Sequence, residues 1–368
     1  MTKKLIPLFI VLIFCLCFCK KNKNNEPEEV ENPFDKQGML QNMADNVIMP
    51  NYTAFSISLD SLISSYNLFK SNTSTVDFQI VKLKLHIAYL KYQQISLYEF
   101  GPAEQQAVRM NFNVFPTDSV QIKTNISSGS YDLLMASNLD AKGFPALDYL
   151  FYDMNKTEAQ IIQSFSASAN KKQYVSDVLT EIQTKMSSII TTWNSSYKNQ
   201  FVNSLSTDVG SSIGFMINQL NFELDYLKNA KIGIPLGKKT LDIALPEKCE
   251  AYYGTQSLEY ALATLTTVEN TYLGRNINGA DGKGFDDYLD HLNVQYGGGT
   301  LNSAIKNQFN TVRTKLNAVN GILSNQIINN PALVNSAYVE LVKLLVLLKT
   351  DMPSNLGVVI TYQDGDGD

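Results

Sequence analysis

Long stretches of mixed apolar and polar residues, with few prolines among them, follow one another from residue 35 almost to the end of the chain. Each stretch is long enough for several turns of helix, and the expected structure is therefore mostly helical. The stretches predicted as helices are 40–49, 56–69, 76–100, 173–197, 201–229, 247–273 and 301–325.

Residues 81–87 (VKLKLHI) are an exception, because apolar and polar positions alternate there as they do in a strand. We still predict a helix, since the surrounding pattern runs for about twenty residues without a turn signal. It ends at Phe100-Gly101-Pro102, where glycine can cap a helix and proline can stop it. His86 falls at helical spacing within this pattern and is predicted to be packed or partly exposed rather than a ligand.

Two apolar segments lie near the C-terminus. Residues 341–348, which include Lys343, have the length of a buried core helix and are too short to span a bilayer. Residues 357–362 are predicted to dock as a short extended segment, and 363–368 to fray. The alternating aspartates of this tail imitate the start of a calcium loop, but the chain ends before the later ligands, so an acidic tail is expected.

The start of the chain has the pattern of an export signal. Lys3 and Lys4 form a positive start, and 5–18 is a nearly unbroken apolar run. A membrane-spanning helix needs roughly 17–25 apolar residues, and neither this run nor any later one is that long. We therefore predict a signal peptide at 1–18 that is removed, rather than a helical anchor.

Residues 16–19 (LCFC) look like a bacterial lipobox, in which the cysteine after the cleavage site receives lipid. Phe18 is bulky where a small residue is usual, so plain secretion and a short uncleaved anchor are the alternatives. Residues 19–34 are predicted to be a lipidated Cys19 and a flexible tether, because they are polar, charged and interrupted by prolines. Only Cys249 remains for the folded part, so lipidation of Cys19 would leave no internal disulfide.

Composition narrows the class of protein. The chain has 368 residues, of which 44% are hydrophobic, and this leaves room for one large or two ordinary domains. Its formal charge of −5 provides no basic surplus for phosphates, so no nucleic-acid partner is expected. Two histidines, His86 and His291, are too few for a multi-histidine metal centre.

One catalytic pattern is present, because residues 210–214 (GSSIG) match GxSxG around Ser212. A nucleophile elbow needs an apolar strand before it, and 203–208 is no such strand. The start of a helix is therefore the favoured interpretation, and a serine hydrolase acting through Ser212 is a remote alternative. The sequence contains no phosphate loop, HExxH motif or dinucleotide fingerprint.

Several blocks of the chain, in their order and approximate spacing, resemble the imelysin-like proteins. The blocks are 45–52 (DNVIMPNY), 98–102 (YEFGP), 111–118 (NFNVFPTD), 143–149 (GFPALDY), 252–259 (YYGTQSLE), 282–289 (GKGFDDYL) and 359–362 (VITY). No single block is diagnostic, and the likeness rests on their order over nearly the whole chain after the predicted signal.

The resemblance implies an all-α protein of two packed helical-bundle lobes, with the functional site in the cleft between them. Members of the family are envelope proteins, often lipoproteins, commonly associated with iron regulation or uptake and historically labelled peptidases. On this plan residues 35–200 form the N-terminal lobe and 201–368 the C-terminal lobe. The expected location is the bacterial cell envelope, with a lipid anchor in the outer membrane that exposes the protein to the periplasm or the surface.

The family's hallmark is the motif GxHxxE, whose histidine and glutamate have been proposed to bind metal. A spacing of three residues places both side chains on one helix face. This chain retains Gly143 but has Pro145 in place of the histidine and Asp148 in place of the glutamate. Proline has no side-chain lone pair, so the pair cannot chelate. A simpler interpretation is that Pro145 starts a helix and Asp148 stabilises its positive end.

Other acids in or beside the resembling blocks could supply oxygen ligands for iron or another divalent cation. The candidate cleft residues are Glu99, Asp118, Tyr149, Glu250, Tyr253 and Glu259. Solvated acids on helix faces are the simpler interpretation of the four carboxylates.

These observations favour a non-catalytic, lipid-anchored envelope protein that requires no cofactor. It would bind a small ligand, a metal or an envelope protein in the interlobe cleft and serve iron acquisition. The alternative is a metal-dependent peptidase or metal carrier that uses the substitute carboxylates.

Overall fold

The computed structural model of the protein describes residues 33–362. From Asp35 onward the chain belongs to one compact unit. The predicted signal peptide, Cys19, nearly all of the tether and the acidic tail 363–368 lie outside the described residues, so these predictions are not tested by the structure.

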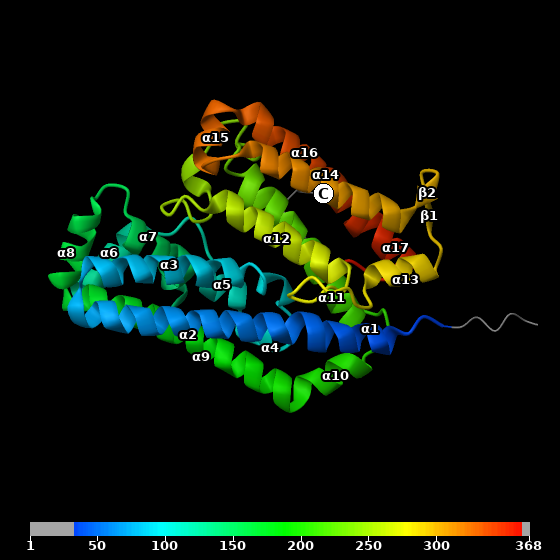
Figure 1. Ribbon diagram of the computed structural model, residues 1–368, viewed down its shortest axis with the longest axis horizontal. Helices are drawn as coiled ribbons and strands as arrows, with labels where there is room; N and C mark the ends of the chain where they lie inside the picture. The colour runs from blue at the N-terminus through cyan, green and yellow to red at the C-terminus, as the bar shows by residue number, and fades with distance from the viewer. Residues whose placement is uncertain (1–32, 363–368) are drawn as a thin grey trace, which may run out of the picture. The chain divides into compact units, whose positions relative to one another are not determined.

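The first lobe is built on three long helices, α2, α3 and α9, which pack side by side (Figure 1). Its elements are α1 (Lys36–Asn42), the π-helical turn η1 (Met43–Ile48), α2 (Met49–Asn72), α3 (Thr75–Tyr92), the 3₁₀ turn η2 (Ser96–Tyr98), α4 (Pro102–Gln105), α5 (Val108–Phe112), α6 (Ser119–Ser128), the 3₁₀ turn η3 (Ala136–Ala141), α7 (Gly143–Tyr152), α8 (Glu158–Ser166), α9 (Ala169–Thr192), the π-helical turn η4 (Trp193–Tyr197) and α10 (Lys198–Asn203).

The second lobe is built on α11, α12, α14 and α16. Its elements are α11 (Ser212–Tyr226), the π-helical turn η5 (Leu227–Gly233), the 3₁₀ turn η6 (Pro246–Lys248), α12 (Ser257–Tyr272), α13 (Phe285–His291), β1 (Gln295–Tyr296), β2 (Gly299–Thr300), α14 (Leu301–Val319), α15 (Leu323–Asn329), α16 (Pro331–Val346), the π-helical turn η7 (Leu347–Asp351) and α17 (Met352–Leu356). In Figure 1, α12 runs between the first lobe and the helices α14 and α16, and it packs on both α3 and α14.

The expected all-α class is confirmed, since the strands of the described residues form one short antiparallel hairpin. The segment 81–87, whose alternation is typical of a strand, lies inside α3 as predicted. The predicted lobe boundary between residues 200 and 201 falls within α10, and the division into separate domains stays a prediction.

Several predicted helix ends are wrong. Residues 36–72 form one continuous helical rod. Pro50, which lacks an N–H, lies just after the π-helical turn η1, where the regular hydrogen-bond ladder is already interrupted. Helix α3 ends at Tyr92, not at Phe100. Residues 204–211 interrupt the helix predicted over 201–229.

Two further predicted helices are shorter than expected. The helical part of 247–273 begins only at Ser257, apart from the single 3₁₀ turn η6. The helix predicted over 301–325 is broken at Asn320 and Gly321, whose φ angles of 39° and 99° lie in the left-handed region. Positive φ ends a right-handed helix, and a glycine adopts it at little cost.

The core of the first lobe is aromatic. Tyr89 stacks on Phe144 with ring centroids 4.8 Å apart, and Phe151 stacks on Phe165 at 5.2 Å. All four rings are at most 1% exposed. The abundant tyrosines and phenylalanines therefore serve mainly as packing residues, because such rings bury large areas and prefer edge or offset contacts.

The helical stretch Pro331–Leu356 is much longer than the apolar run 341–348 that predicts it. It has 26 residues, and its most apolar window has a mean hydropathy of 1.6, which suffices to cross a membrane by length and composition alone. The core helices of water-soluble domains meet the same criterion. Leu341, Leu344 and Leu348 are fully buried, as predicted for a core helix, while 39% of the window is buried overall. The predicted length was too short because polar residues on both sides of 341–348 end the apolar run but not the helix.

The end of the described chain is held against α11. Asn218 donates from Nδ2 to the carbonyl of Val359 at 3.0 Å and accepts the backbone N–H of Thr361 at 2.7 Å. The ring of Tyr362 meets Phe222 edge-on with centroids 5.8 Å apart. Residues 359–362 thus dock on α11 as predicted, without regular secondary structure.

Candidate functional site

The degenerate motif forms the start of α7, which is buried along nearly its whole length. Gly143 has φ of +73°, and a side chain there would place its Cβ 2.4 Å from the carbonyl oxygen of Phe112. Only glycine fits this position, so the motif glycine is explained by packing. Pro145 lies in the first turn of the helix, as predicted, where a missing N–H costs nothing.

Asp148 does not act as predicted. The first turn of α7 contains no acidic residue, and Asp148 lies further along, only 4% exposed. Its two carboxylate oxygens accept the backbone N–H groups of Tyr253 and Gly254, each at 3.0 Å. Asp148 therefore ties α7 to the segment before α12 instead of stabilising a helix end.

Gly254 permits this close approach. A Cβ at this position would lie 2.4 Å from Oδ1 of Asp148, far inside van der Waals contact. Burial raises the pKa of Asp148 to about 7, and the negative charge of Glu250 nearby acts in the same direction. The N–H groups of Gly254 and Tyr253 oppose this shift, because they favour the charged form. The carboxyl group is thus buried, with each oxygen accepting one backbone N–H.

A cavity of about 170 Å³ lies beside Asp148 and is lined by residues of both lobes. From the first lobe come Phe115, Pro116, Thr117, Pro145 and Asp148; from the second come Glu247, Cys249, Ala251, Tyr252 and Tyr253. Three of the predicted site residues, Pro145, Asp148 and Tyr253, line this cavity. Burial raises the pKa of the Cys249 thiol to about 12, so it is no nucleophile at neutral pH.

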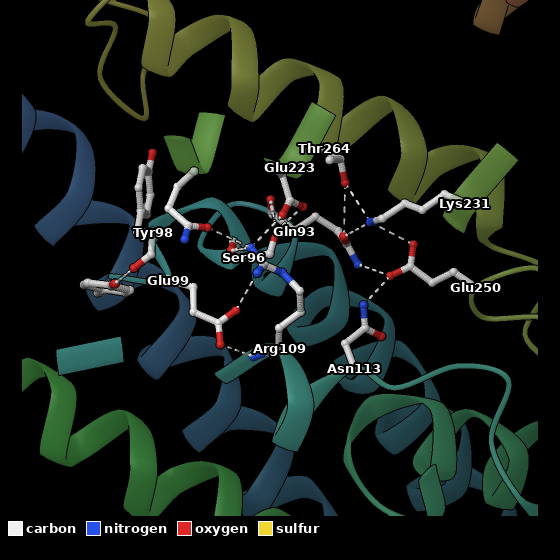
Figure 2. Close-up of polar contacts among 12 residues, drawn as sticks. Gln93, Ser96, Tyr98, Glu99, Arg109, Asn113, Glu223, Lys231, Glu250 and Thr264 are labelled. Carbon is white, nitrogen blue, oxygen red and sulfur yellow. Dashed lines mark hydrogen bonds and ion pairs between the residues drawn. The ribbon is translucent and has the colours of Figure 1, made fainter. Parts of the chain in front are cut away.

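A buried polar network joins the lobes next to this cavity (Figure 2). Nζ of Lys231 lies 3.0 Å from a carboxylate oxygen of Glu250, and both residues are at most 2% exposed. Glu250 also accepts hydrogen bonds from Gln93 at 2.9 Å and Asn113 at 2.7 Å, both in the first lobe. Lys231 further donates to Thr264 of α12 at 2.8 Å.

The same network continues through Arg109, whose guanidinium lies between two acids from different lobes (Figure 2). It pairs with Glu99 at 2.8 Å and with Glu223 at 3.2 Å. Ser96 donates to the second of these carboxylates at 2.7 Å. Each buried acid of the network therefore has a cation or several donors, which is the condition for keeping charge out of water.

The four acids predicted as substitute ligands occupy different settings. Glu99 pairs with Arg109 and Glu250 with Lys231. Asp118 is the N-cap of α6 and accepts the backbone N–H groups of Val120 and Gln121. Within residues 33–362, no group of three or more His, Cys, Asp or Glu side chains lies close enough to hold one metal ion.

Glu259, the fourth of these acids, lies on the exposed side of α12 and pairs with His86 at 3.5 Å. The same histidine stacks on Tyr260 and is half-buried, as predicted for a packed residue. The ring of Tyr149 meets that of Tyr253 edge-on with centroids 5.0 Å apart, and Tyr149 itself lines a second, larger cavity among α6, α7, α8 and α9.

Ser212 begins α11, as the helix-start interpretation predicts. Its hydroxyl donates to the carbonyl of Phe201 at 2.7 Å, and the preceding Ser211 caps the helix by accepting the N–H of Gly214. The segment leading to Ser212 is irregular rather than a strand, so the geometry of a nucleophile elbow is not met.

Sequence reasoning missed most of the network, because its members are placed by contacts between segments far apart in the chain. The missed residues are Gln93, Arg109, Asn113, Glu223 and Lys231. A usable signal existed in part, since a lysine and a glutamate inside otherwise apolar helical stretches need buried partners.

Fold and site together define an all-helical protein of two lobes, joined by a buried ion-pair network beside a motif cavity. The chain belongs to the imelysin family, whose model matches residues 48–348.

Relatives and solved structures agree with this family. The chain is 19% identical over 290 residues to iron-regulated protein A of Synechococcus elongatus, covering 76% of this chain and 75% of that protein. A candidate iron-regulated protein A precursor from Parabacteroides distasonis has the same fold, with a TM-score of 0.71, 14% identity, and coverage of 91% of this chain and 97% of the other. An imelysin-like protein from Psychrobacter arcticum also has this fold, with a TM-score of 0.67 and 15% identity, and the match covers 89% of this chain and 97% of the other.

Proposed function

We propose that the protein is a non-catalytic member of the imelysin family that binds a ligand or partner at the junction of its lobes. The observation that carries this proposal is the state of the motif. Both oxygens of Asp148 are used by the N–H groups of Tyr253 and Gly254, and Pro145 supplies no donor atom. A metal site normally fails when one of its few protein ligands is lost, and here Pro145 supplies none while each oxygen of Asp148 already accepts a backbone N–H.

The predicted address and the names of relatives support a role in the cell envelope and in iron acquisition. A leader with a lipobox-like sequence at 16–19 precedes the folded unit, so we propose a lipid anchor at Cys19 in the outer membrane. The relative from Synechococcus elongatus is named for regulation by iron. A binding protein that is regulated by iron would bind a ligand, or transfer it to a partner, when iron is scarce.

The first test is metal titration of the natural protein and of the double variant Pro145→His, Asp148→Glu, followed by calorimetry with Fe²⁺ and Zn²⁺. The natural protein should show no saturable binding, whereas the double variant should bind with a dissociation constant at least tenfold below the highest concentration tested, because it regains two ligands on one helix face. The single variant Asp148→Glu controls for the change of acid alone and should remain without metal.

Tight metal binding by the natural protein, together with peptide cleavage that a chelator abolishes, would overturn the proposal in favour of a metal-dependent peptidase or carrier. A second arm tests the iron link in cells, by comparing growth of the deletion strain and its parent under iron limitation. Equal growth at every iron level would contradict a role in iron acquisition while leaving the motif argument intact.

A further inference from the structure

A cavity that the motif does not explain lies in the first lobe, among α6, α7, α8 and α9. Its volume is about 430 Å³, which falls within the range of pockets that hold small organic ligands. One part of its wall is apolar, formed by Ile122, Ile126, Tyr149 and Leu150. It is lined by other residues than the interlobe cavity beside Asp148.

The polar part of the wall is basic. Lys123, Lys156 and Lys171 line the cavity, and Asp153 is the one carboxylate in its described lining. Lys156 pairs with Asp153 at 3.0 Å, which leaves the ammonium groups of Lys123 and Lys171 in excess. A positive cavity in a chain of formal charge −5 is not explained by overall composition.

Lys171 is the unusual member of this set, because it is only 8% exposed. Its Nζ donates to Oγ of Ser164 at 2.8 Å and lies 4.0 Å from the centre of the Phe165 ring. Within the part of the chain that the structure describes, this ammonium group thus meets a hydroxyl and a ring face rather than a carboxylate. Lysine is almost never buried without a charge partner unless something else uses the charge.

The setting of Lys171 is strained electrostatically as well. Burial lowers the pKa of Lys171 to about 7, and the positive charge of Lys156 acts in the same direction while Asp153 opposes it. An anion bound beside the amine would supply the missing counter-charge and favour the protonated form.

We propose that this cavity binds a small organic carboxylate with an apolar body, such as a medium-chain fatty acid. Its carboxylate lies against Nζ of Lys171, with Lys123 at the rim, and its chain lies against Ile122, Ile126 and Leu150. Charge-assisted hydrogen bonds to the head and burial of the chain both contribute to binding. The site goes beyond the proposed role of the lobe junction, since no residue of the buried network lines it.

The experiment is calorimetric titration of the full chain carrying Cys19→Ser, so that no attached lipid competes, with octanoate and with 1-octanol as the neutral probe of equal length. Octanoate should bind saturably at one site and at least tenfold more tightly than 1-octanol. Lys171→Met should weaken octanoate at least tenfold and leave 1-octanol within twofold, because the methionine keeps the apolar stem. Lys172→Met, the next residue of α9 and outside the cavity lining, is the matched control and should change neither.

Two further variants keep the proposal testable if Lys171→Met does not fold. Lys123→Glu, at an exposed rim position, should weaken octanoate several-fold, and Ile126→Trp should block both probes by filling the cavity. Absence of saturable octanoate binding, equal affinity for octanoate and 1-octanol, or octanoate binding unchanged in the lysine variants would each overturn the proposal.

Discussion

Asp148 and Gly254 depend on each other although 106 positions separate them in the chain. The carboxylate reaches the N–H of Gly254 only because that residue carries no side chain, and the segment before α12 is fixed against α7 by this contact. A contact of this kind transmits a change at either residue to the walls of the cavity beside them.

Gly254→Ala should therefore destabilise the protein by about 1–3 kcal/mol, the usual cost of forcing a methyl group into a packed site. The measurement is urea denaturation followed by circular dichroism. Gly299→Ala is the matched control, because the added methyl group would lie 4.0 Å from the nearest neighbouring atom and φ at this residue is not positive. Its effect should stay below about 0.5 kcal/mol. The cost of Gly254→Ala should shrink in an Asp148→Ala background, and an unchanged cost there would contradict the contact described.

Asp148 also gives stability a defined dependence on pH. Because burial raises its pKa from 3.8 to about 7 in the folded state, the folded protein binds a proton between these values that the unfolded chain does not. Its contribution to stability is therefore greatest at the acid end and falls as pH rises from about 4 to 7, by at most about 1.4 kcal/mol per pH unit. Asp148→Asn should remove this slope, as measured by urea denaturation from pH 4 to pH 8. Parallel curves for the two proteins would show that the carboxyl group does not titrate in this range.

At the scale of the element, helix class was predictable and helix ends were not. Periodic apolar positions predict α2, α3, α9 and α14, but α3 stops at Tyr92 because the next turns direct Gln93 and Ser96 to partners in the second lobe. Those partners lie more than a hundred residues further along the chain, and local patterns carry no information about them. The start of α11 was predictable because a serine N-cap is a local signal.

Capping of α6 by Asp118 gives a test at this scale, since the residue predicted as a metal ligand serves to start a helix. Asp118→Ala should cost about 1 kcal/mol of stability, whereas Asp118→Asn should retain most of it because asparagine is an equally good cap. The difference is measured from urea denaturation midpoints. An equal loss in both variants would indicate that charge, not capping, is the contribution of Asp118.

At the scale of the whole molecule, the lobes are joined through buried ion pairs as well as apolar packing. Lys231, Glu250 and Arg109 come from three separate parts of the chain and meet where the lobes contact. The family resemblance implied a site in a cleft between the lobes. The network around it could not be predicted, because each member is recognisable only by a partner that folding brings close.

Lys231→Met should destabilise the whole protein by about 3–5 kcal/mol, because Glu250 is left buried without its cation. The double variant Lys231→Met, Glu250→Gln should recover part of this loss, since no charge then needs compensation. Lys238→Met, which removes the exposed pair with Asp242, is the control and should cost at most about 1 kcal/mol. The stability of the three variants is measured by urea denaturation followed by tryptophan fluorescence. Similar losses of stability for Lys231→Met and Lys238→Met would contradict the role of the network.

The position of Cys249 has a practical consequence. It is the single cysteine after residue 19, and its side chain is buried in the wall of the interlobe cavity. A thiol-reactive dye can modify it only while the segment before α12 moves away from α7. The labelling rate under native conditions therefore reports how readily this wall of the cavity opens, and the folded part of the chain supplies the probe itself.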